Sequence, residues 1–87
     1  MQEYDEAVIA FEGALEINEQ LAEAWLGLGN ICACLEDYEE AERCYKKAVS
    51  IKPGYAEAYQ GLAQVYDYQG RKEELEAIQA KLAKLDS

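Results

Sequence analysis

The chain has 87 residues, of which 51% are apolar and 30% charged, so it has the size and composition of one small folded domain. Its 18 acidic and 8 basic residues give a net charge of -10, and it contains no histidine. Without an imidazole, neither a histidine-dependent catalytic site nor a histidine-ligated zinc site can form. The acidic balance argues against nucleic-acid binding, and no apolar run reaches the roughly 18 residues of a membrane span. We therefore expect no enzyme, no cofactor, no metal, and neither nucleic acid nor membrane as a partner.

The charges are unevenly distributed along the chain. Residues 1–42 hold twelve acids and no base, whereas residues 43–87 hold all eight bases and six acids. Surface charge mainly keeps proteins soluble, and this is the interpretation that the sequence favours. The alternative is that the acidic half steers basic partners toward itself.

Five helices are predicted along the chain. The first covers residues 3–18. The second covers residues 21–35, in which Ala24, Leu28 and Ile31 recur every three or four residues on one face. Such a stripe is typical of a helix that packs against neighbours on one side only.

The third helix is expected between Asp37 and Pro53. Asp37 is a good residue to begin a helix, and Glu40, three positions later, would complete a capping box. Pro53 cannot continue a helix and therefore predicts its end.

The last two helices are separated by Gly70. The fourth begins near Tyr55 and ends at this glycine. The fifth runs to about residue 86. Its apolar positions are Leu75, Ile78, Leu82 and Leu85.

The sequence repeats itself with a period of 34 residues. When residues 1–53 are compared with residues 35–87, fourteen positions are identical, where this composition gives about five by chance. One of these identities is Gly27 with Gly61, and a further position changes conservatively from Phe11 to Tyr45. A fixed period of this length is typical of stacked helix-turn-helix units.

The residues that recur resemble the tetratricopeptide repeat. The resemblance rests on three stretches, namely Trp25-x-x-Leu28-Gly29-x-x-Cys32, Ala41-x-x-x-Tyr45-x-x-Ala48, and Pro53. Cys32 departs from the pattern, because the family usually has tyrosine there. The next unit keeps Tyr59-x-x-Leu62-Ala63-x-x-Tyr66 and then diverges at Leu75, Gln79 and Leu82. The resemblance implies an all-α solenoid of five antiparallel helices in a right-handed superhelical arc.

The resemblance also divides the single domain, residues 1–87, into units. Residues 3–18 correspond to the second helix of a first repeat, residues 21–52 to a full repeat, and residues 55–86 to a divergent repeat with a capping helix. The half repeat lacks its partner helix, so we expect an exposed end face. Its residues are Ala7, Phe11 and Ala14. Two explanations stay open: the chain is a fragment of a longer repeat protein, or it covers this face by forming a homodimer.

Repeats of this family are similar in holding a partner peptide or helix on the concave face, which the first helix of each pair lines. Helical spacing places eight residues on that face: Glu23, Leu26, Asn30, Cys34, Glu57, Gln60, Gln64 and Tyr68. Gly27 and Gly61 lie between them, and we expect these glycines to let a ligand approach the backbone. The predicted function is therefore a scaffold that binds a protein or peptide partner.

The charge of the partner can be predicted from the same helices. Some members of the family bind a C-terminal carboxylate through lysine, arginine and asparagine on the inner helices. Asn30 matches one such position, but Leu26, Glu57 and Gly61 occupy the basic ones. We therefore expect a basic or neutral partner rather than an acidic tail, with Asp67 as a further counter-charge.

Three cysteines are the remaining candidates for redox or metal chemistry. With no recognisable export signal, Cys32, Cys34 and Cys44 are expected to be free thiols in the cytoplasm. Residues two apart on a helix point to nearly opposite sides, so Cys32 and Cys34 are a poor ligand pair. We interpret all three as small packing or incidental residues.

Overall fold

The structure is a computed structural model that describes residues 2–86, with the side chains of residues 5–85. Within this range the chain forms five α-helices and no strand. The helices are α1 (Gln2–Ile17), α2 (Ala22–Cys34), α3 (Tyr38–Ile51), α4 (Ala56–Gln69) and α5 (Lys72–Asp86). In the described part of the chain, no helix combines the length and hydropathy needed to cross a bilayer.

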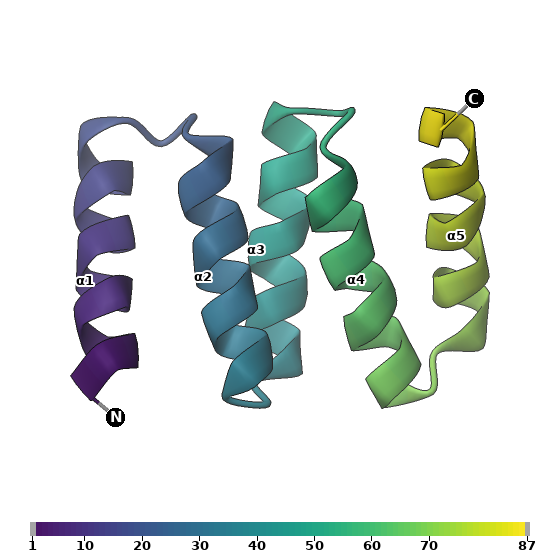
Figure 1. The fold of residues 1–87 in the computed structure, drawn as a ribbon, viewed down its shortest axis with the longest axis horizontal. Helices are drawn as coiled ribbons and strands as arrows, with labels where there is room; N and C mark the ends of the chain where they lie inside the picture. Colours follow the sequence, from purple (N-terminus) through teal and green to yellow (C-terminus); the bar gives the residue numbers. More distant parts are fainter. Residues whose placement is uncertain (1, 87) are drawn as a thin grey trace.

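Successive helices run antiparallel and stand side by side in chain order (Figure 1). Each helix packs against the next, and α2 also contacts α4 across the intervening helix. The first helices of the two complete units therefore form an inner layer, and α3 and α5 lie outside it. This arrangement confirms the predicted all-α helix-turn-helix solenoid of five antiparallel helices.

Small residues allow these helices to approach closely. Ala41, Ala48 and Ala58 have no exposed surface, and the larger side chains of Leu62 and Val65 are also fully buried. Four tyrosines also belong to this core, namely Tyr45, Tyr55, Tyr59 and Tyr66. Close packing of this kind makes the core sensitive to added volume as well as to lost volume.

One aromatic ring is inserted between three helices. The ring of Tyr45, on α3, lies against Gly29 of α2 and Gly61 of α4. A Cβ atom added at these glycines would come within 2.8 Å and 2.4 Å of the ring. The space beside each of these two glycines is therefore filled by an aromatic side chain of another helix.

The same contact occurs one period earlier in the chain. Phe11, on α1, lies against Gly27 of α2, where an added Cβ atom would come within 2.3 Å of the ring. Each pair, Phe11 with Gly27 and Tyr45 with Gly61, spans the same number of residues. The packing of an aromatic ring against a glycine thus joins one repeat to the next.

Helices α2 and α4 end in the same way, with different residues. Gly70 follows α4 in the left-handed conformation, at φ 71°. Glu36 occupies the equivalent position after α2, at φ 64°, and the amide of Asp37 donates to the Cys32 carbonyl at 2.8 Å. Glycine adopts this conformation without steric cost, whereas glutamate does so at a cost.

The predicted capping box at α3 was wrong. Asp37 does stand at the N-cap position, but its side chain makes no capping hydrogen bond. Glu40 is engaged by Arg43, whose Nε donates to the Glu40 carboxylate at 3.0 Å. The carboxylate therefore faces along its own helix and does not reach back to its start.

A charged cluster around Glu42 joins the second unit to the third. Arg71 Nη1 donates to Glu42 Oε1 at 2.7 Å, and the Tyr66 hydroxyl donates to Glu42 Oε2 at 2.9 Å. Lys46 lies 2.9 Å from the same carboxylate, and the Arg71 guanidinium stacks over the Tyr66 ring. The hydrogen bond from Arg71, with smaller contributions from Lys46 and Tyr66, lowers the pKa of Glu42 from 4.5 to about 2.

We predict that Gly61→Ala lowers the free energy of unfolding by about 2 kcal/mol, because the new methyl group collides with the Tyr45 ring. Gly13→Ala is the matched control. This glycine also lies in a helix, but no atom is close to its missing side chain, so alanine should stabilise the protein by about 0.5–1 kcal/mol. Urea unfolding followed by circular dichroism measures both effects. Equal stabilisation by the two substitutions would contradict the Tyr45 contact.

We predict that Glu42→Gln lowers the free energy of unfolding at pH 7 by about 2 kcal/mol, because hydrogen bonds to a charged acceptor are lost. A carboxylate whose pKa is lowered in the folded protein stabilises the fold at pH values above 4.5, its ordinary pKa. This stabilisation disappears as the pH falls toward about 2, the pKa of Glu42 in the folded protein. The difference in stability between wild type and variant should therefore shrink as the pH falls from about 5 to about 2. Exposed Glu39 on the same helix provides the control, Glu39→Gln. A difference that does not change with pH would contradict the assignment.

Candidate functional site

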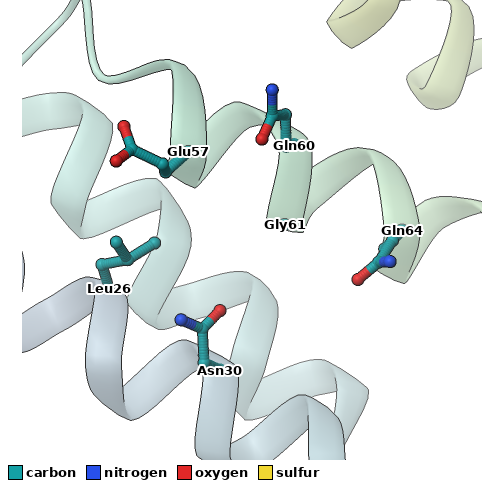
Figure 2. Close-up of a pocket in the computed structure, with 6 residues that line it drawn as sticks. All are labelled: Leu26, Asn30, Glu57, Gln60, Gly61 and Gln64. Carbon is teal, nitrogen blue, oxygen red and sulfur yellow. The ribbon is translucent and has the colours of Figure 1, made fainter.

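A groove runs between the inner helices α2 and α4. It encloses a volume of about 390 Å³. We call it the central groove, and its lining residues are Leu26, Asn30, Glu57, Gln60, Gly61 and Gln64. Figure 2 shows Leu26 and Asn30 on one helix facing Glu57, Gly61 and Gln64 on the other. The groove thus combines an apolar side chain, three amides and one carboxylate.

The central groove exists because each inner helix buries one face and leaves the other free. Positions four residues apart lie on the same side of a helix, and this spacing separates Leu26 from Asn30 and Gln60 from Gln64. The buried Tyr45 ring lies between the two helices, and its hydroxyl donates to Asn30 Oδ1 at 2.5 Å. Asn30 is therefore held in place by the same tyrosine that joins the repeats.

A second hollow of about 440 Å³ adjoins the central groove. We call it the tyrosine hollow, and its lining residues are Asn30, Ala33, Cys34, Glu36, Tyr38, Tyr45, Gln64 and Tyr68. Asn30 and Gln64 line both spaces. The two hollows therefore form one continuous surface along α2 and α4.

Most of the predicted concave-face residues come together on this surface. Seven of them line one hollow or the other: Leu26, Asn30, Cys34, Glu57, Gln60, Gln64 and Tyr68. Glu23 is exposed on α2 and lines neither. Asp67 lines a third space of about 330 Å³ between α4 and α5, together with Gln60 and Gln64.

Four residues of the tyrosine hollow were not predicted from the sequence as site residues, namely Ala33, Glu36, Tyr38 and Tyr45. Glu36 lies in the turn after α2, and Tyr38 begins α3. The prediction considered only the inner helices, so residues contributed by the turn and by an outer helix were missed. The signal that could have found Glu36 is its place in the repeat, where the next unit has Gly70.

Another hollow that the sequence did not reveal lies beside α1. It has a volume of about 550 Å³ and contains the Trp25 ring, with Arg43 at its edge. The Trp25 indole donates to the Glu19 carbonyl at 3.0 Å, so the turn between α1 and α2 fixes the ring. Glu12, Glu16 and Glu19 also line this hollow, which is therefore mostly acidic.

Two glycines between the predicted site residues have a packing role that was not predicted. Gly27 and Gly61 were expected to let a ligand approach the backbone, and the structure places the rings of Phe11 and Tyr45 where their side chains would be. Gly61 still lines the central groove with its backbone. The absence of side chains at these positions serves internal packing.

The expected end face of α1 also differs in the structure. Ala7, Phe11 and Ala14 are half-buried, because α1 turns this face toward α2 and the Phe11 ring reaches Gly27. Among the described side chains of α1, the large apolar ones left exposed are Ile9, at 69% exposure, and Ile17, at 90%.

The cysteines lie in three different environments. Cys44 is buried and Cys32 half-buried, whereas Cys34 is exposed in the tyrosine hollow. Burial is the main cause that raises the pKa of Cys44 to about 12, and burial likewise raises the pKa of Cys32. A thiol with a raised pKa is a weak nucleophile at neutral pH. Among the described residues, no group of three cysteine or acidic side chains is placed to hold a metal ion.

Comparison with known proteins identifies the fold. Sequence models of the tetratricopeptide repeat match residues 22–55 and residues 44–79. The chain belongs to the tetratricopeptide repeat family. No curated protein matches the sequence closely enough to count as a relative.

Solved structures extend the similarity of this tetratricopeptide repeat protein to almost its whole length. A crystal structure of MamA is 28% identical, with a TM-score of 0.93 over 97% of this chain and 49% of that one. A second MamA crystal structure is also 28% identical, with a TM-score of 0.89 over 97% of this chain and 46% of that one. The chain spans about half the length of these MamA chains. Family and fold together support a protein-interaction scaffold.

Proposed function

We propose that this tetratricopeptide repeat protein is a non-catalytic module that binds an extended peptide or a helix of a partner in the central groove. The observation that carries the proposal is the continuous surface of the two hollows along α2 and α4. Amide side chains at Asn30, Gln60 and Gln64 can hydrogen-bond a peptide backbone, and Leu26 offers apolar contact. The free thiols suit a reducing compartment, and we propose the cytoplasm.

The charge of the surface supports a basic or neutral partner. The charged residues that line the central groove and the tyrosine hollow are Glu57 and Glu36, and no base lines either space. An acidic tail would meet repulsion, whereas a basic segment would be attracted. Charges at the edge of an interface act mainly on the association rate and on salt sensitivity.

A random peptide display library, selected on the purified protein, tests this proposal. We expect selected peptides to be basic or neutral and to bind more weakly as the salt concentration rises. Leu26→Arg should weaken their binding about ten-fold or more, because it fills the centre of the central groove. Gln20→Arg adds the same charge at an exposed position outside both hollows and should change affinity little.

Two outcomes of this selection would contradict groove binding. One is a set of acidic peptides whose affinity rises with salt. The other is a set of peptides that bind Leu26→Arg and wild type equally well, since their site would then lie elsewhere on the molecule.

Self-association is the second candidate function, and the surface of α1 favours it. Ile9 and Ile17 are the most exposed of the large apolar residues on this helix. Burying them against a second copy would remove apolar surface from water. In this case the chain would act as a structural module that forms a homodimer.

Sedimentation equilibrium over a range of protein concentrations tests self-association. A dimer is expected to appear as the concentration rises, and Ile17→Lys should shift the equilibrium to monomer. Leu35→Lys is the matched control, because Leu35 is also exposed but lies outside α1. A wild-type protein that stays monomeric throughout would exclude the α1 homodimer.

A further inference from the structure

Two tyrosines form an exposed stack in the tyrosine hollow. The ring centroids of Tyr38 and Tyr68 lie 5.5 Å apart, and the ring planes are inclined by only 13°. Tyr68 is 71% exposed. The stack holds Tyr68 in a defined orientation while leaving much of its surface to solvent. A flat or cationic group can stack on the exposed face of such a ring.

A carboxylate without a basic partner stands beside these rings. Glu36 lines the same hollow, and its charge contributes, after burial, to raising the pKa of Tyr38. Among the side chains that the structure describes, no base pairs with Glu36. The hollow therefore places an unpaired negative charge next to an exposed aromatic face.

The backbone conformation of Glu36 lowers the stability of the fold. Its φ of 64° lies in the left-handed region, and the next unit fills the equivalent position with Gly70 at φ 71°. Glycine at position 36 would avoid the steric cost. Backbone strain at a position that presents a side chain to a hollow points to a role for that side chain beyond stability.

We propose that the tyrosine hollow is the subsite for an arginine side chain of the bound peptide. The proposal rests on the peptide-binding function proposed above and specifies one side chain of the ligand. The planar guanidinium would stack on the exposed face of Tyr68, while its N–H groups donate to the Glu36 carboxylate. Gln64, which lines both spaces, would contribute its amide oxygen where the peptide passes from the central groove.

Arginine fits this chemistry better than lysine does. A guanidinium is flat, so it can lie against a ring and donate to a carboxylate at the same time, whereas an ammonium group is a compact point charge. The hollow also contains no base of its own that would repel a guanidinium. Arginine is thus the side chain that uses the ring and the carboxylate together.

The probe for this subsite is a blocked heptapeptide with arginine at the centre of six alanines. Isotope-labelled protein is titrated with this peptide, and the ring and amide signals of Tyr38 and Tyr68 are followed by nuclear magnetic resonance. We expect saturable shifts at these signals. The same peptide with citrulline, which keeps the shape and loses the charge, should bind at least about five-fold more weakly, and the lysine peptide should also bind more weakly.

Substitutions in the protein measure the contribution of the Tyr68 ring to binding separately from that of the Glu36 charge. Tyr68→Ala should weaken the arginine peptide about three-fold to five-fold, and Tyr68→Phe should retain binding, because it keeps the aromatic face. Glu36→Gln should weaken the arginine peptide about three-fold and reduce its preference over citrulline. Glu76→Gln is the matched control, because Glu76 is exposed on α5 outside the hollow.

Glu36→Gly distinguishes a binding role from a structural one. We expect this variant to unfold at a higher urea concentration than wild type, because the left-handed strain is removed. We also expect it to bind the arginine peptide more weakly than wild type. A variant that is more stable and binds equally well would overturn the role of Glu36.

The outcomes also separate this inference from the function on which it rests. If the citrulline and arginine peptides bind equally, or if neither shifts the tyrosine signals, the arginine subsite is excluded. Display peptides that still lose affinity with Leu26→Arg would then leave groove binding intact. Conversely, specific arginine shifts without any selected groove peptide would support the subsite and contradict the groove.

Discussion

The insertion of the Tyr45 ring between Gly29 and Gly61 is the contact on which the arrangement of the two complete repeats depends. It brings α2, α3 and α4 together at one point, and it leaves no room for a side chain at either glycine. Phe11 and Gly27 repeat the same contact between α1 and α2. Because aromatic and glycine recur with the period of the chain, the same geometry is produced at each junction between repeats.

This contact also builds the candidate site. It sets the separation of α2 and α4, and these two helices line the central groove. The Tyr45 hydroxyl then holds Asn30 by a hydrogen bond, so packing and site geometry share one residue. Burial raises the pKa of Tyr45 to about 12, which keeps this hydroxyl a proton donor at every physiological pH. Glu42 also joins the same two repeats, through its hydrogen bonds from Arg71.

Much of the fold and part of the site could be predicted because they depend on local periodicity. The 34-residue period, the apolar stripes and Gly70 were sufficient to place five helices and their order. Helical spacing, together with the inner face that the family resemblance implies, also brought Leu26, Asn30, Gln60 and Gln64 to one surface. The capping box at Asp37 could not be judged in this way, because Glu40 had a competing partner in Arg43.

Some features of this protein, such as its net charge of -10, follow from the sequence alone, and others depend on the tertiary structure. The sequence by itself determined a histidine-free, acidic helical repeat, because composition and helical period are properties of the chain. Only the tertiary structure decided that Gly27 and Gly61 accommodate rings, and that Glu36 and Tyr38 join Tyr68 in one hollow. These residues lie on different helices or in turns, and their distances depend on how the helices pack. No local pattern encodes such a distance.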